Sequence, residues 1–205
     1  IEKGRENLLT QSNDFTTWGL DDVTITSGQG GYDGTNNATK VLGNTNSSRH
    51  NLIRSFSLTA PLAISIYVKA SGHNYIQIAS ATTSGQYINF DLSDGSIGNV
   101  GGDAISEYVE DIGGGWYRIG FVTGRSLNSY YISLVSSKTA GWLESWAMPN
   151  ATDGVLIQSA QIEQGLAVTP YIESFATTGK AGLLEDEPRF DYSGGASCPS
   201  LLLEP

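Results

Sequence analysis

The sequence has little of the chemistry on which most enzymes and metalloproteins depend. Its 205 residues include one cysteine, Cys198, and two histidines, His50 and His73. A single cysteine excludes an intrachain disulfide and a cysteine-based zinc site, and the two histidines have the spacing of neither a metal pair nor a hydrolase triad. Carboxylate pairs for glycoside hydrolysis can lie far apart in a sequence, but none sits in a recognisable motif. We therefore expect a protein that is not an enzyme and that holds no cofactor.

Basic residues are also scarce. The 11 lysines and arginines are scattered singly along the chain, against 21 aspartates and glutamates, and the net charge is −10. Without a basic cluster, nucleic acids and anionic membrane surfaces are poor candidate partners. No apolar run approaches the length of about 18 residues that a membrane helix needs, so no membrane insertion is expected. The N-terminal residues also lack the pattern of a signal peptide.

What the sequence does contain favours β-structure. Charged residues make up 16% of the chain, and 25 glycines with many Ser, Thr and Asn residues suit short strands joined by tight turns. Apolar and polar residues alternate from about residue 22 to residue 163. The predicted strands are 22–26, 38–42, 51–58, 63–69, 75–79, 87–91, 116–122, 130–135 and 155–163. The expected fold class is all-β, an antiparallel β-sandwich of jelly-roll type.

Turn residues and the end of the alternation set the expected domain limits. The predicted turns with positive φ angles lie at Asp33-Gly34, Ser71-Gly72, Asp94-Gly95, Gly113-Gly114-Gly115 and Asp153-Gly154. After residue 176 the alternation stops. We interpret residues 1–176 as one β-sandwich domain and residues 177–205 as a linker or extended arm. The apolar run 201–203 is expected either to pack on a neighbouring domain or subunit or to be a frayed end.

Several short stretches follow one another in a recognisable order between residues 7 and 172. They are NLLTQSNDF (7–15) with Trp18, DGT (33–35) with ATK (38–40), YVKA (67–70), GWYR (115–118), and AQIE (160–163) with Gly165 and YI (171–172). Together they resemble a carbohydrate-binding-module-like domain of bacteriophage head-fibre and tail-fibre proteins. The opening RENLL and the closing PRFDY and CPSLLLEP also resemble segments that follow one another in large phage fibre proteins. The resemblance implies a module of a multidomain protein at the virion surface, which needs no export signal.

The resemblance also bears on calcium. The wider relatives are jelly-roll carbohydrate-binding modules of polysaccharide-degrading enzymes, many of which hold a structural calcium ion. In their pattern, acidic residues occupy the places of Thr16 and Gln158, which are neutral here. Calcium prefers sites with several oxygens, carboxylates among them, so the resemblance implies a calcium ion only if Asp14 and Glu163 substitute. The alternative is that Asp14 caps a turn and Glu163 lies on the surface.

Alternation separates an apolar face of the predicted strands from a polar face. The expected core residues are Ile64, Ile66, Val68, Ile76, Ile78, Ile88, Phe90, Tyr117, Ile119, Phe121, Tyr130, Ile132 and Leu134. The neighbouring outward positions combine tyrosines with amide and charged groups, a mixture that suits the apolar face and the hydroxyl rim of a pyranose. The candidate carbohydrate-binding residues on this face are Tyr67, Lys69, Tyr75, Gln77, Tyr87, Asn89, Arg118 and Tyr131. The alternatives are ordinary solvent-facing strands or a subunit contact.

Two tryptophans form a further candidate. Trp142 and Trp146 lie in the predicted loop 140–150, where they either form an exposed stacking platform for sugars or cap the end of the core. The leading hypothesis is a noncatalytic virion-surface module that binds host-surface or environmental polysaccharide weakly, in a trimer whose repeated sites act together. The alternatives are a structural virion component that contacts other virion subunits, and a carbohydrate-binding appendage of a bacterial polysaccharide-degrading enzyme.

Overall fold

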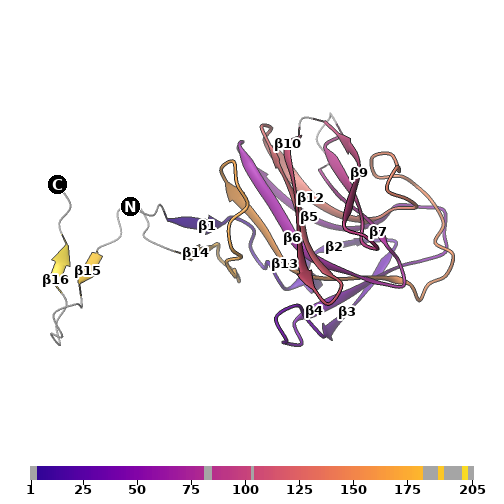
Figure 1. The fold of residues 1–205 in the computed structure, drawn as a ribbon, viewed down its shortest axis with the longest axis horizontal. Helices are drawn as coiled ribbons and strands as arrows, with labels where there is room; N and C mark the ends of the chain where they lie inside the picture. Colours follow the sequence, from indigo (N-terminus) through magenta and orange to yellow (C-terminus); the bar gives the residue numbers. More distant parts are fainter. Residues whose placement is uncertain (1–3, 81–84, 103, 182–188, 192–199, 203–205) are drawn as a thin grey trace.

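The chain folds into two six-stranded antiparallel sheets that pack face to face (Figure 1). This computed structural model describes residues 4–80, 85–102, 104–181, 189–191 and 200–202. One sheet, named here the β6 sheet, contains in spatial order β10 (Ala104–Gly113), β11 (Trp116–Thr123), β6 (Leu62–Ser71), β13 (Gly154–Gln164), β4 (Ala38–Gly43) and β3 (Val23–Gln29). The other, the β12 sheet, contains β2 (Gly19–Asp21), β5 (His50–Leu58), β12 (Leu127–Leu134), β7 (Tyr75–Ala79), β8 (Tyr87–Asp91) and β9 (Ser96–Gly101).

This arrangement confirms the predicted antiparallel β-sandwich and is consistent with a jelly roll. Each of the predicted strands is present, and β7 and β8 have the predicted limits. A 3₁₀ helix, η1 (Phe15–Thr17), precedes β2. Among the described residues, no helix is long and apolar enough to cross a membrane.

The predicted apolar set fills the space between the two sheets. Every member is buried except Tyr117, which is partly buried and packs against the same cluster. Phe15 and Trp18, from the segment around η1, join this core with their ring centres 5.1 Å apart. The core therefore extends from the paired sheets into the loop that precedes them.

Tyr130 is a large core residue whose hydroxyl group is unfavourable to bury. Its side chain is 0% exposed, and its hydroxyl has no hydrogen-bond partner in the described part of the chain. Burial raises the pKa of this hydroxyl far above its ordinary value, so the group stays neutral. Phenylalanine would keep the ring contact with Trp18, whose centre lies 5.7 Å away. We expect Tyr130→Phe to raise the free energy of unfolding by about 1 kcal/mol, measured by urea denaturation.

Tyr171→Phe is the matched control, because the Tyr171 hydroxyl lies 2.7 Å from the Ser12 hydroxyl. This control is expected to lower stability by about 1 kcal/mol. A loss of stability in Tyr130→Phe would contradict the interpretation of its hydroxyl as unpaired.

Gly154 is required for a different reason from the turn that the sequence predicted. Gly34, Gly72, Gly95 and the Gly113–Gly115 run have the predicted positive φ angles. Gly154, predicted as a turn residue, instead begins β13. A Cβ atom on it would lie 1.9 Å from the carbonyl oxygen of Val41 in β4. Glycine is therefore required there for close approach of two strands, and alanine would force them apart.

Two short strand pairs lie outside the sandwich. Strand β1 (Arg5–Asn7) pairs with β14 (Gly179–Ala181), so part of the segment interpreted as an arm is paired with the start of the domain. Strand β15 (Arg189–Asp191) pairs with β16 (Ser200–Leu202), and Figure 1 shows this pair beyond β1 and β14. The expected packing of the apolar run 201–203 concerns side chains outside the described part of the chain.

Candidate functional site

The outward residues that sequence grouped on one face lie on two opposite faces. Tyr67, Lys69 and Arg118 belong to β6 and β11, in the β6 sheet. The other five candidates on this list belong to β7, β8 and β12, in the β12 sheet: Tyr75, Gln77, Tyr87, Asn89 and Tyr131. The outer faces of two packed sheets point in opposite directions. The prediction of a single sugar-binding face is therefore wrong, because alternation distinguishes inside from outside but does not identify the sheet.

The loop between β12 and β13 covers part of the outer face of the β12 sheet. Gln77 and Asn89 are 0% exposed beneath it. The Gln77 amide nitrogen donates to Asn89 Oδ1 (2.7 Å) and to the Gly141 carbonyl (3.0 Å), and Gln77 Oε1 accepts from the Leu143 amide at 2.8 Å. The Asn89 amide donates to the Ala140 carbonyl at 2.8 Å. These two side chains hold the loop on the sheet and present no surface to a ligand, whereas Tyr75, Tyr87 and Tyr131 are partly exposed.

The two loop tryptophans have separate surroundings. Trp142 is partly buried; its indole nitrogen donates to the Ser80 carbonyl at 3.1 Å, and the Arg49 guanidinium lies 5.7 Å from its ring centre. Trp146 packs against the core, and its indole nitrogen donates to the Leu134 carbonyl at 2.9 Å. Trp146 thus helps to close one end of the sandwich, and only Trp142 lies over the covered sheet face.

Part of the outer face of the β6 sheet, around Tyr67 and Arg118, is also covered. Tyr67 is buried and stacks on Tyr32, with the ring centres 3.8 Å apart. Arg118 is buried beside Tyr67, at 5.1 Å from its ring centre. Its guanidinium donates to the Ser65 hydroxyl at 3.0 Å and to the Thr169 carbonyl at 2.6 Å. Arg118 therefore anchors the segment that follows β13, Tyr67 packs against Tyr32 in the connection between β3 and β4, and Lys69 remains partly exposed.

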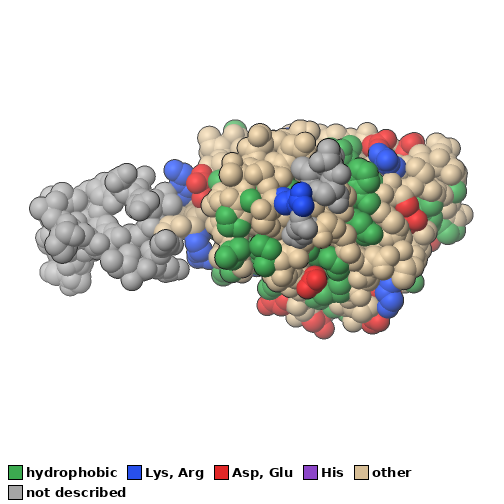
Figure 2. All heavy atoms as spheres, turned by 90° about the horizontal axis from the view of Figure 1, so that it is seen from above, with side chains coloured by type: hydrophobic (Ala, Val, Ile, Leu, Met, Phe, Trp, Pro, Cys, Tyr) green, Lys and Arg blue, Asp and Glu red, His purple; other side chains and the backbone are tan. Residues whose placement is uncertain are grey.

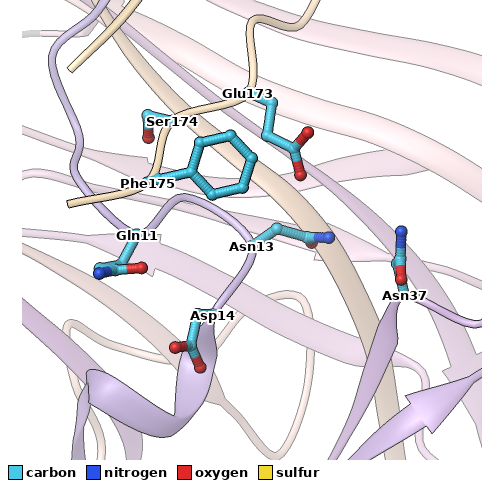
Figure 3. Close-up of a pocket in the computed structure, with 7 residues that line it drawn as sticks. All are labelled: Gln11, Asn13, Asp14, Asn37, Glu173, Ser174 and Phe175. Atoms are coloured by element: carbon cyan, nitrogen blue, oxygen red, sulfur yellow. The ribbon is translucent and has the colours of Figure 1, made fainter. Parts of the chain in front are cut away.

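A hollow of about 170 Å³ opens elsewhere, where sequence predicted no site (Figure 3). Three segments that are distant in sequence border it: the loop before η1, the residue before β4, and the segment after β13. Its lining residues are Gln11, Asn13, Asp14, Asn37, Glu173, Ser174 and Phe175. The Phe175 side chain is 65% exposed. The hollow thus combines an accessible aromatic ring with amide and carboxylate groups.

Asn7 holds the first of these segments against the sandwich. Its side chain is fully buried. The amide nitrogen donates to the carbonyls of Ala160 (3.1 Å) and Ile172 (2.8 Å). Its oxygen accepts from the amides of Leu9 and Ile162, each at 3.1 Å. One side chain therefore joins the opening loop, β13 and the segment that leads to Phe175.

Further hydrogen bonds fix the Phe175 backbone while its ring stays exposed. The Gln11 amide, at a left-handed φ of 56°, donates to the Phe175 carbonyl at 2.7 Å. The Ser174 amide donates to the Ser12 hydroxyl at 3.0 Å, and the Tyr171 hydroxyl lies 2.7 Å from the same oxygen. Burial raises the pKa of Tyr171 to about 12, so this hydroxyl is neutral at ordinary pH. The ring is consequently carried on a preorganised backbone.

A bulge in β13 positions Asn13. The register of β13 against β6 shifts between Gln158 and Gln161, and Ser159 adopts a positive φ of 56°. A bulge leaves a backbone group outside the ladder. Here the Ser159 amide donates to Asn13 Oδ1 at 2.9 Å. This bond orients the Asn13 amide, and the Asn13 side chain lines the hollow.

Gln158 forms hydrogen bonds at the place where the resemblance implied a calcium ligand. Its amide nitrogen donates to Asp33 Oδ2 at 3.0 Å, and its oxygen accepts from the Tyr32 amide at 3.1 Å. Burial alone raises the pKa of Asp33, but hydrogen bonds from Thr35 and Gln158 outweigh it and keep this pKa below its ordinary value. The Asp33 carboxylate is therefore bound to a neutral amide.

The other carboxylates considered for calcium are also engaged separately. Asp14 accepts from the Thr16 amide at 3.2 Å and caps η1, as the alternative interpretation stated. Glu163 is buried and accepts from the Thr169 amide at 3.0 Å, so its expected surface position is wrong. Among the described residues, no three His, Cys, Asp or Glu side chains are grouped to hold a metal ion. These residues do not fit a calcium site of the implied kind.

The family resemblance rests on short stretches of sequence alone. No protein-family model matches the chain, and no curated protein is significantly similar to it.

Proposed function

We propose that this chain is a noncatalytic carbohydrate-binding module and that a pyranose ring binds in the hollow beside Phe175. The observation that carries the proposal is the exposed Phe175 ring on a fixed backbone. The apolar C–H face of a pyranose stacks on an aromatic ring. Because the backbone is already ordered, little conformational entropy is lost when a ligand binds.

The polar groups around the ring suit the rim of a sugar. Figure 3 shows the side chains of Asn13, Asn37 and Glu173 around the same opening as Phe175. Amides both donate and accept hydrogen bonds, and carboxylates accept them from hydroxyl groups. Sugar hydroxyls need both kinds of partner. One ring face with a few polar groups favours weak binding of a single sugar unit.

The proposed setting is a bacteriophage fibre or another virion-surface protein. This setting is supported by the short stretches between residues 7 and 172 that resemble phage fibre domains in the same order. One of them, NLLTQSNDF, supplies Asn13 to the hollow, and it supplies Asn7 and Ser12 to the hydrogen bonds that hold the surrounding segments. In a trimer, several weak sites would act together on one polysaccharide through their high effective concentration. The proposed ligand is therefore a repetitive polysaccharide of the host surface or its environment.

Phe175→Ala tests this function. In a glycan-array screen of the trimerised fragment, with host polysaccharides included, we expect this variant to bind about tenfold more weakly per site, or about 1.4 kcal/mol. The cause is loss of the stacking surface. Because the ring is exposed, the free energy of unfolding should change by less than about 0.5 kcal/mol.

Ile105→Ala is the matched control, since Ile105 is also largely exposed but lies on β10, outside the hollow. Its binding should equal that of the wild type.

Tyr131→Ala distinguishes the hollow from the outer face of the β12 sheet. Loss of binding in Tyr131→Ala with retention in Phe175→Ala would move the site to that face. A folded wild-type protein that binds no glycan would overturn the proposal.

A second candidate function is a structural virion component, favoured by exposed apolar side chains on two neighbouring edge strands. Three large apolar residues are exposed there: Ile97 and Val100 on β9, and Ile105 on β10. Strands β9 and β10 are edge strands of different sheets, and the two strands contact one another. Exposed edge strands are sites of pairing with other chains. Sedimentation of the wild type and of Ile105→Ser distinguishes this function: self-association lost in the variant would support subunit contacts.

A further inference from the structure

We infer that the Phe175 hollow selects uncharged glycans and discriminates against glycans that carry carboxylate or sulfate groups. This inference rests on the proposed function and names its ligand class. The hollow has two carboxylates in its lining, Asp14 and Glu173, and none of its seven lining residues is basic. An anionic sugar in this position would lie beside like charges without a cation to pair with.

The Glu173 carboxylate is the more available of the two. It is exposed, and in the described part of the chain no hydrogen bond or ion pair engages its oxygens. Asp14 uses one oxygen to accept from the Thr16 amide and hydroxyl. An ionised carboxylate only accepts hydrogen bonds, so Glu173 can pair with a sugar hydroxyl but not with a sugar carboxylate.

In the described part of the chain, no cation lines the hollow to offset these two carboxylates. Arg54, which contacts the loop before η1, donates to the Thr10 hydroxyl at 2.7 Å and to the Thr17 carbonyl at 3.3 Å, and it does not line the hollow. On the face drawn in Figure 2, basic side chains stand apart from one another. The overall charge of −10 adds a long-range repulsion of polyanions, which salt screens over about 8 Å at physiological ionic strength.

The test compares glycans that differ only in charge. Cello-, manno- and galacto-oligosaccharides are presented beside oligomers of the corresponding uronic acids, with the same length and linkage, at physiological salt. We expect the trimerised wild type to bind at least one neutral oligomer about tenfold more tightly than its acidic counterpart, a difference of about 1.4 kcal/mol. Preferential binding of an acidic oligomer would overturn the inference and leave the proposed function intact.

Two variants with the same change in net charge separate a local effect from a global one. Glu173→Gln removes the carboxylate at the hollow, whereas Glu107→Gln removes an exposed carboxylate from β10. We expect the neutral-to-acidic ratio to fall at least threefold in Glu173→Gln and to stay unchanged in Glu107→Gln. Equal ratios in the two variants would overturn the inference by assigning the discrimination to net charge. Absence of binding to any glycan, neutral or acidic, would overturn both the inference and the proposed function.

Discussion

Replacement of Asn7 by alanine is expected to lower the free energy of unfolding by about 3–5 kcal/mol, because it leaves several buried polar groups without partners. The Asn7 amide now satisfies the carbonyls of Ala160 and Ile172 and the backbone amides of Leu9 and Ile162. Alanine supplies neither donors nor an acceptor, and the site is closed to water. Urea denaturation followed by tryptophan fluorescence measures the loss.

Asn44→Ala is the control for this experiment. Asn44 is partly exposed; its amide donates to Asp22 Oδ1 at 2.6 Å and its oxygen accepts from the Asn46 amide at 2.9 Å, both bonds being open to solvent. A solvent-exposed bond of this kind is replaced by water, so the expected change is below about 1 kcal/mol. If Asn7→Ala were as stable as Asn44→Ala, the account of Asn7 as the link between the opening loop and the Phe175 segment would be wrong.

Gln77→Ala is expected to lower the free energy of unfolding by about 2–4 kcal/mol, although Gln77 was predicted to lie at a sugar-binding surface. The variant would leave Asn89 Oδ1, the Gly141 carbonyl and the Leu143 amide without their present partner. The loop that these groups hold would loosen from the β12 sheet. The expected result is a lower melting temperature and faster proteolysis between residues 136 and 144, with glycan binding unchanged where the protein remains folded.

The Gln77–Asn89 pair allows this structural role to be tested further. Because the two amides share a hydrogen bond and a loop, the losses in Gln77→Ala and Asn89→Ala should sum to more than the loss in the double variant by about 1 kcal/mol. Gln29→Ala, which removes a long bond of 3.4 Å in an exposed strand, is the control. Stable single variants that nevertheless fail to bind glycans would return Gln77 to the binding surface.

Alternation predicted those strands whose two sides differ in environment. Strands β7 and β8 have one side in the core and the other under a loop or solvent, and their limits were predicted correctly. Strand β10 was missed although it has ten residues. It lies at a sheet edge, most of its residues are partly or fully exposed, and acidic side chains such as Glu107 and Glu110 occupy it. Where neither face is buried, sequence carries no period-two signal.

The candidate site depends on long-range contacts that the sequence pattern does not contain. Gln77 and Asn89 were correctly predicted to point outward, but their partners in the covering loop lie 49 to 66 residues further along the chain. Phe175 follows the last sandwich strand, in a segment without alternation, so no pattern indicated that its ring would be exposed. The stretch NLLTQSNDF was singled out by resemblance alone, and the buried hydrogen bonds that Asn7 and Ser12 make to the segment before Phe175 could not be inferred from it.

The pairing of β1 with β14 suggests how the fold would respond to a mechanical load. Arg5 lies opposite Ala181 and Asn7 opposite Gly179, so the chain enters and leaves the sandwich side by side. A force that separates the flanking segments acts across this ladder and opens its pairs one after another, starting at Arg5 and Ala181. Because the hydrogen bonds of an antiparallel ladder run across the strands, separation from one end breaks them singly, whereas sliding along the strands must break them together. We therefore expect the outer pairs, at Arg5 and Glu6, to separate first and the opening to stop at Asn7, whose buried side chain joins β1 to β13 and to the segment that leads to Phe175.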